Sequence, residues 1–197
     1  MVRINSIFFL LGFSFIIPLN INGQSIIHPH KVGIGYHYSN SLDKNVTAYS
    51  HNFYFSSGKF DFYGSISSAE DEEQTISGGG VGFNIASIKE ERKFIPSFSA
   101  FIGSVEDLTV LAIGPTMTFQ LFDNETLRIL PEAGCALMLI GLFSESVVSK
   151  SELSFYIGIN HSIKIIDEFI LTINPAYNIT ESISYFNISA GFSILLL

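Results

Sequence analysis

The 197-residue sequence is poor in cysteine, tryptophan and charge. Its single cysteine, Cys135, cannot form an internal disulfide, and no Cys/His group has the spacing of a zinc site, so we expect no cofactor and no metal. Only 10 Lys and Arg stand against 18 Asp and Glu, a net charge of -8. Binding to phosphates needs clustered basic side chains, so a nucleic-acid partner is not expected. Charged residues make up 14% of the chain, well below the roughly 25% of ordinary soluble domains.

Long apolar runs are also missing, apart from one near the start. Residues 7–17 are almost all apolar, which is about half the ~20 residues of a membrane-spanning helix and typical of the core of a secretory signal. We expect cleavage between Gly23 and Gln24, which gives a signal peptide at 1–23 and a periplasmic lead-in at 24–30. The alternative is an uncleaved anchor or a disordered N-terminus. After the signal, no run approaches 18 apolar residues, so helical membrane spans are not expected.

What the mature chain has instead is alternation with a period of two, which puts one set of side chains on each face of a strand. It is clearest from Glu152 to Leu197. One face there is almost wholly apolar, as in Phe155, Ile157 and Ile159, while the residues between them are small or polar. The three strands of this region are each longer than the usual ~5 to 6 residues. Strands of this length suit a tilted crossing of a membrane.

The same alternation predicts further strands along the whole of 31–197. They are expected at 31–39, 46–56, 59–68, 76–86, 94–104, 108–122 and 127–143. Tight polar turns at Ser57–Lys59, Lys89–Lys93, Asp123–Glu125 and Asp167–Glu168 alternate with connections at Ser41–Asn45, Ala69–Thr75 and Ser144–Ser151, most of which are longer. The sequence therefore predicts an all-β fold, a single up-and-down antiparallel transmembrane β-barrel of about ten strands, or eight if two of these segments are loops.

The composition of the polar face distinguishes a membrane barrel from a soluble one. A face open to bulk water is expected to carry many Lys and Glu. Here it carries mainly Gly, Ser, Thr, Asn and Tyr, which fit the narrow lumen of a small barrel. The apolar face, rich in Phe, Ile and Leu, is then expected to contact lipid. The alternative is a soluble secreted ligand-binding barrel such as a lipocalin.

The signal segment, the amphipathic strands of Glu152–Leu197 and the alternating turn lengths together resemble the small outer-membrane β-barrel proteins of Gram-negative bacteria. The resemblance implies an outer-membrane location, contact with outer-membrane lipid and recognition by the barrel-assembly machinery during biogenesis. Members commonly end in an aromatic residue, whereas this sequence ends Ile194-Leu195-Leu196-Leu197. The oligomeric state is left open.

Charged residues at alternating positions are expected on the lumen face. They are Asp61, Arg128, Glu132, Glu152 and Lys164. Arg128 and Glu132 share a face but lie about 13 Å apart along one strand, too far for direct contact without partners on other strands. We interpret the group as a salt-bridged plug in a narrow lumen, the alternative being a conduction path. A barrel of this size then has a structural or surface-interaction role and no catalytic one.

A competing enzymatic interpretation rests on His37-Tyr38-Ser39-Asn40. This segment is similar to the His-x-Ser-Asn segment of outer-membrane phospholipases and lipid A deacylases, in which the histidine is the base and the serine the nucleophile. No glycine follows Asn40, and alternation turns His37 and Ser39 toward the lumen, away from a lipid substrate. The hypothesis of a lipid esterase is therefore the alternative and not the expectation.

Two further motifs have simpler interpretations. The run Gly78–Gly82 looks like a phosphate-binding loop, but no Lys-Ser/Thr follows it, so glycines on the lumen face of a curved strand are expected. His28-Pro29-His30 offers two imidazoles without an evident third ligand, and it precedes the first strand. We interpret it as part of the periplasmic lead-in.

Overall fold

The computed structural model describes residues 32–42, 47–57, 59–70, 75–87, 93–106, 108–124, 126–142, 147–181 and 184–196. The expected signal peptide and the lead-in with its two histidines lie outside these ranges. No helix in the described ranges is long and apolar enough to cross a membrane.

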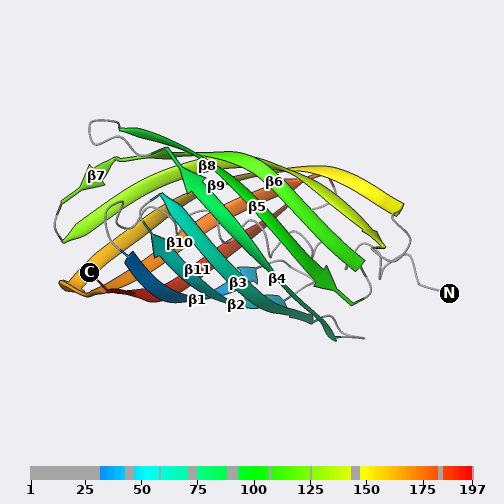
Figure 1. Ribbon diagram of the computed structural model, residues 1–197, viewed down its shortest axis with the longest axis horizontal. Coiled ribbons are helices and arrows are strands. Elements are labelled where there is room, and N and C mark those ends of the chain that lie inside the picture. Colours follow the sequence, from blue (N-terminus) through cyan, green and yellow to red (C-terminus); the bar gives the residue numbers. More distant parts are fainter. Residues whose placement is uncertain are drawn as a thin grey trace.

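The described residues form one antiparallel sheet that closes on itself (Figure 1). Its strands are β1 (Val32–Leu42), β2 (Thr47–Ser57), β3 (Phe60–Glu70), β4 (Thr75–Ala86), β5 (Phe94–Val105), β6 (Leu108–Phe119), β7 (Phe122–Asp123), β8 (Leu127–Leu142), β9 (Val147–Ile166), β10 (Phe169–Thr180) and β11 (Ser184–Leu195). Each long strand pairs with the next, β6 pairs with β8, and β1 pairs with β11. The fold is thus a closed up-and-down barrel with ten long strands, and β7 adds two residues to one rim. The predicted fold is confirmed, with ten strands and not eight.

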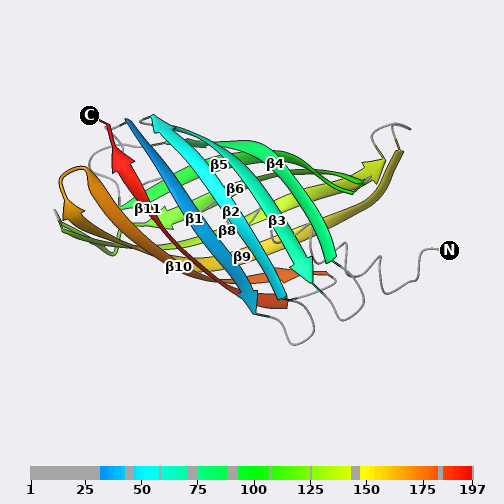
Figure 2. The same cartoon turned by 90° about the horizontal axis from the view of Figure 1, so that it is seen from below.

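The two ends of the barrel are told apart by the strand ends that lie there. At one end β2 turns into β3, and β9 turns into β10 through Asp167 and Glu168. The first residues of β1 and the last of β11 lie at the same end, where Gly33 pairs with Leu195 (Figure 2). We call this the turn end. The opposite end, where β1 ends and β2 begins, is the loop end.

Two segments differ from the expected pattern. The strand expected over 108–122 is broken after Phe119, because the chain changes its pairing partner there. The backbone N of Gln120 still donates to Lys93 O beside β5. The next backbone N, of Leu121, donates to Ile129 O of β8. The pairing with β8 resumes one residue out of register, which is the mark of a bulge. The loop expected over Ser144–Ser151 is shorter than predicted, because β9 already begins at Val147.

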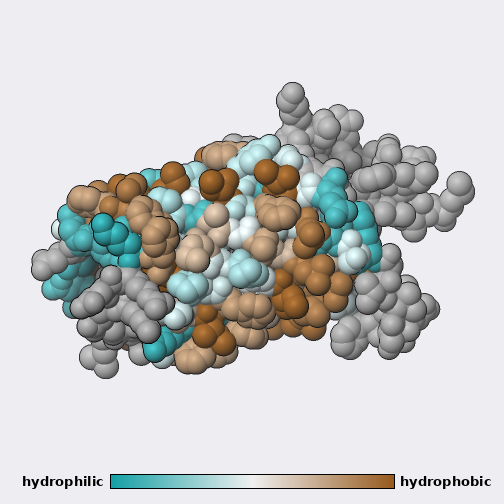
Figure 3. Space-filling model, turned by 90° about the horizontal axis from the view of Figure 1, so that it is seen from above, coloured by the Kyte–Doolittle hydropathy of each residue, from teal (hydrophilic) through white to brown (hydrophobic). Residues whose placement is uncertain are grey.

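Alternation along the strands separates an exposed outer face from a buried inner face. In β10, Ile173 is 51% exposed, whereas its neighbours Thr172 and Asn174 are 1% and 4% exposed. The outer wall is apolar on every long strand, with residues such as Phe62, Val81 and Ile157 exposed. In the space-filling view of one side, brown apolar residues spread over the middle of the wall, and the deeper teal polar residues gather mostly toward its ends (Figure 3).

Candidate functional site: the barrel interior

The interior is lined by small polar side chains arranged in rows around the barrel. Residues that pair across adjacent strands stand opposite one another, so their inward side chains meet in the lumen. Near the turn end, Asp61, Asn84 and Ser99 form such a row on β3, β4 and β5. Ser99 Oγ donates to Asn84 Oδ1 at 3.0 Å, and Asn84 Nδ2 donates to Asp61 Oδ2 at 3.4 Å. The buried carboxylate of Asp61 is therefore held by neutral donors.

Glu132 also accepts a hydrogen bond from a neutral side chain, which lies two strands away. Asn174 Nδ2 on β10 donates to Glu132 Oε1 on β8 at 3.1 Å, passing over β9. The strand between them carries Gly158 at this level, directly opposite Glu132. A Cβ on Gly158 would lie 3.2 Å from Asn174 Oδ1, so a larger residue there would crowd the amide. The glycine therefore makes room for a contact between strands that are not neighbours.

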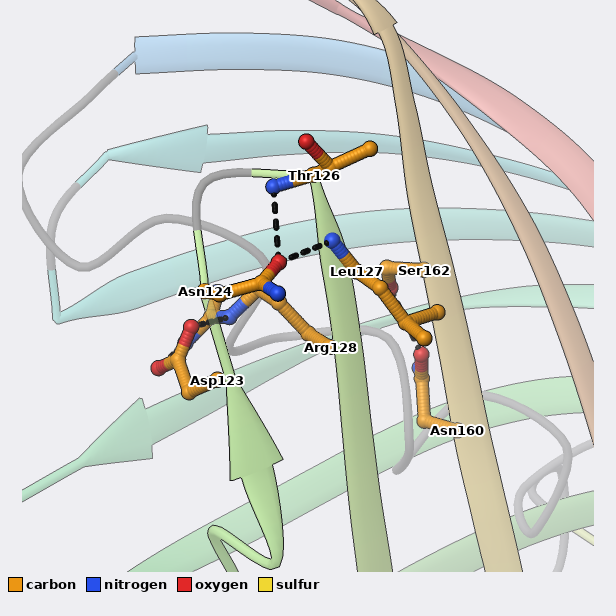
Figure 4. Close-up of polar contacts among 7 residues, drawn as sticks. All are labelled: Asp123, Asn124, Thr126, Leu127, Arg128, Asn160 and Ser162. Atoms are coloured by element: carbon orange, nitrogen blue, oxygen red, sulfur yellow. Dashed lines mark hydrogen bonds and ion pairs between the residues drawn. The ribbon is translucent and has the colours of Figure 1, made fainter.

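Arg128 lies at the turn end and pairs with the short strand β7. Its Nε donates to Asp123 Oδ1 at 2.8 Å and one terminal nitrogen donates to Asp123 Oδ2 at 2.9 Å, a bidentate pair (Figure 4). Asn124 closes the same hairpin, because its Oδ1 accepts from the backbone N of Thr126 and of Leu127 at 2.9 and 2.7 Å. This confirms the tight turn expected at Asp123–Glu125 and fixes the rim of the barrel at β7–β8.

The remaining two charges lie at opposite ends. Glu152 is buried near the loop end and forms an ion pair with Lys150 on the same face of β9. Lys164 lies at the turn end, where its Nζ contacts Asp167 Oδ1 at 3.0 Å. Each of the two is neutralised by a partner close to it in the sequence.

Asp61, Arg128, Glu132 and Glu152 are buried, and Lys164 is partly exposed. Arg128 pairs with Asp123 at the rim and Glu132 bonds Asn174 farther along β8. These contacts lie at several levels of the lumen, and the interpretation of the charged group as a salt-bridged plug stays a hypothesis.

A feature that the sequence reasoning missed is the pairing of inward tyrosines with glycines. Tyr54 stands opposite Gly35, Tyr63 opposite Gly82, and Tyr156 opposite Gly134. In each pair, a Cβ built on the glycine would overlap the tyrosine ring, so the ring lies across the neighbouring strand. The signal was present in the sequence, as tyrosine and glycine at lumen-facing positions, but it becomes visible only once the register is known.

The pair on β3 and β4 extends to a third strand. Tyr63 Oη donates to the carbonyl oxygen of Ala100 on β5 at 3.3 Å, beyond Gly82 on β4. Its ring stacks on Phe101 of β5, with 6.2 Å between centroids and 7° between planes. These rings cover the inner wall of β3–β5 and bury apolar surface inside a mostly polar lumen.

The segment of the esterase hypothesis lies in β1, and its backbone pairs without a shift in register from Val32 to Leu42. His37 stands opposite Asn52 and Ser39 opposite Ser50, and both partners are buried. Asn40 is opposite Tyr49. The side chains of His37 and Ser39 lie outside the described part of the structure, so the catalytic pairing stays a hypothesis.

The other motifs are placed as follows. Gly78–Gly82 belongs to β4, with Gly78, Gly80 and Gly82 on its inner side, so the phosphate-loop interpretation is not supported. Among the residues that the structure describes, no group of three or more His, Cys, Asp or Glu side chains could hold a metal ion.

Comparison with known proteins relates the chain to others by fold alone. No protein-family model matches it, and no curated protein matches its sequence. Among solved structures, the β-domain of the Bordetella autotransporter BrkA is similar, with a TM-score of 0.50 and 9% identity, covering 84% of this chain and 99% of that one. The KdgM porin (TM-score 0.44, 8% identity) covers 81% of this chain and 98% of its own. The N-terminal β-barrel domain of Pseudomonas aeruginosa OprF (TM-score 0.37, 8% identity) covers 85% and 98%. The chain thus has the fold of the transmembrane β-barrels.

Proposed function

We propose that this protein is an outer-membrane β-barrel whose outer wall contacts lipid and whose narrow lumen is closed by its own side chains, in a structural or surface-interaction role. The proposal rests on the exposure of large apolar side chains on the outer wall. Large apolar residues on all the long strands are exposed, among them Ile66 at 62% and Ile157 at 61%. Monomeric soluble proteins rarely expose apolar patches above roughly 300–600 Å². A closed barrel in lipid needs this kind of wall and leaves no unpaired strand edge.

The proposed orientation follows from the ends of the first and last strands. A closed barrel with an even number of long strands has both of these strand ends on one side, which in the outer-membrane barrels that this chain resembles is the periplasmic side. The turn end, which holds the first residues of β1 and the last of β11, is then periplasmic. The loop end faces the outside of the cell and is where a surface interaction would take place.

Fractionation tests the location. We expect the protein in the outer-membrane fraction, released only by detergent, with gel migration that changes on heating because the closed barrel resists unfolding. Recovery from the periplasm or the medium without detergent would contradict the proposal and favour the soluble ligand-binding barrel.

The proposed role is also non-catalytic. A lipid esterase would need the imidazole of His37 and the hydroxyl of Ser39 within about 3 Å and open to acyl esters. The even pairing of β1 gives no bulge that would turn this segment toward the lipid. We expect purified protein in mixed micelles to release no fatty acid from phospholipid or lipid A, with or without calcium. Fatty-acid release that is lost in Ser39→Ala, while the barrel stays folded, would establish the esterase instead.

A further inference from the structure

The outer wall has an apolar groove of about 990 Å³, which extends over β1–β6 and β11. Its sides are large apolar residues such as Phe53, Phe62, Val81 and Phe83. Its floor lies at Gly64, which has no side chain. Gly64 pairs with Phe53 on one neighbouring strand and with Val81 on the other. The volume lies at the upper end of the ~300–1,000 Å³ of ordinary ligand pockets.

A hydrogen-bonded polar pair adjoins this groove on the outer face. Tyr36 lines the groove opposite Phe53, and its Oη lies 2.6 Å from Nδ1 of His51. His51 is the next outward residue on β2, about 6.6 Å from Phe53 toward the loop end. The rings of Tyr38 and Tyr49 pack around the imidazole, with centroids at 5.6 and 6.3 Å.

The Tyr36–His51 pair lies at the edge of the apolar wall that is nearer to the loop end. Across the sheet, the row of His51 continues through Ile66 and Gly79 to Ser104. The next row toward the loop end holds Ser68 and Ser77, whose hydroxyl oxygens are 3.0 Å apart. The groove therefore lies at hydrocarbon depth, and the polar pair at the depth of lipid ester and phosphate groups.

The hydrogen bond to Tyr36 determines whether the other ring nitrogen of His51 is a donor or an acceptor. Tyr36 Oη donates to Nδ1 in the tautomer that carries its proton on Nε2, and this tautomer presents an N–H donor on the far side of the ring. None of the residues that the structure describes bonds this Nε2. Lipid ester and phosphate oxygens are acceptors, so a donor directed toward them is complementary.

From the groove and the pair together we infer that this wall holds one acyl lipid of the leaflet at the loop end, with an acyl chain in the groove and His51 Nε2–H bonded to an ester or phosphate oxygen of the same molecule. The inference rests on the proposed function, because it requires the wall to face lipid. It adds a specific lipid site to a surface that otherwise contacts lipid without preference.

The absence of tryptophan from the chain allows a direct test. Phe83→Trp places a fluorescent reporter in the groove, away from the polar pair, and Phe155→Trp places a matched reporter on β9, outside it. Each is folded in micelles of a glycoside detergent, which has no ester or phosphate group, and phosphatidylcholine with brominated acyl chains, which quench tryptophan on contact, is added in rising amounts. We expect quenching at both positions, with Phe83→Trp saturating at a lower mole fraction of the lipid.

Two substitutions then separate the site from the general wall. His51→Phe removes the donor and should weaken lipid binding at the groove reporter by roughly two- to tenfold, the range of one net hydrogen bond. Gly64→Leu fills the floor of the groove, where a Cβ meets only Gly80 O at 3.9 Å, and heat-modifiable gel migration checks that the variant is folded. The matched controls are His161→Phe and Ala133→Leu, which lie on the outer face of β9 and β8 and should leave the groove reporter unchanged.

The outcomes distinguish the inference from the function on which it rests. Equal quenching curves at the two reporters, or no effect of both His51→Phe and Gly64→Leu, would overturn the lipid site while leaving a lipid-facing wall. Absence of quenching at both reporters in a folded barrel would overturn the proposed function together with the inference.

Discussion

At the scale of single residues, the inward tyrosines depend on glycines of the neighbouring strand. We expect Gly82→Ala to destabilise the barrel by about 1–3 kcal/mol, because the new methyl group would overlap the ring of Tyr63 and displace it from the wall. The free energy of unfolding in urea, measured on protein folded in detergent micelles, checks this. Gly64→Ala is the control, since a Cβ there meets only Gly80 O at 3.9 Å and should change stability little. Equal losses in the two variants would show that the ring contact is not the cause.

The contact between Glu132 and Asn174 gives a second prediction at this scale. Asn174→Ala removes the donor and leaves a buried carboxyl group without it, which should lower the free energy of unfolding by about 1–3 kcal/mol. In a double-mutant cycle, the same substitution in a Glu132→Ala background should have a smaller effect, because the acceptor is already gone. Additive losses would contradict a direct bond over Gly158.

At the scale of elements, the β7–β8 hairpin is held mainly by two side chains, Asn124 and Arg128. Asn124→Ala removes the acceptor for two backbone N–H groups and should weaken the turn by about 1 kcal/mol. We expect faster hydrogen exchange at Thr126 and Leu127 and unchanged exchange in β10. Asn124→Asp, which keeps an acceptor oxygen, is the control. Exchange that rises equally throughout the barrel would mean that the turn is coupled to global unfolding.

The strands also show where sequence patterns suffice and where they do not. The bounds of β10 and β11 were predictable within about a residue, because alternation there is strict. The break after Phe119 was not, since it follows from a change of pairing partner that alternation does not encode. The polar stretch before Glu152 looked like a loop, but in a barrel with a polar lumen a buried charged residue is part of a strand.

The same limit applies to the interior. Period-two patterning placed Asp61, Glu132 and Glu152 correctly on the inner face. Their partners could not be predicted, because the contact of Glu132 with Asn174 crosses β9 and depends on the register of two strand pairs. The pairing of Arg128 with Asp123 depends on the break that creates β7.

At the scale of the whole molecule, the first question is whether the lumen conducts ions. The inward side chains are nearly all buried, from Ser50 at 0% exposed to Arg128 at 7%. We expect no large, stable conductance from the wild-type barrel in planar bilayers, because general porins need about 16 to 18 strands. Arg128→Ala should also stay closed, since this residue pairs with Asp123 in the rim hairpin. Large, stable wild-type conductance would contradict a closed lumen, and opening in the variant would identify Arg128 as a gate.

The measurement that tests the central claim most directly is the accessibility of spin labels along β10, in a Cys135→Ala background that removes the native thiol. Labels placed singly from 169 to 179 are examined in vesicles with oxygen, which partitions into lipid, and with a nickel complex, which stays in water. The account predicts high oxygen and low nickel accessibility at the outward positions Leu171, Ile173 and Tyr177, and low oxygen accessibility at Thr172 and Asn174 between them. High nickel accessibility at the outward positions would contradict it, because the apolar wall would then face water.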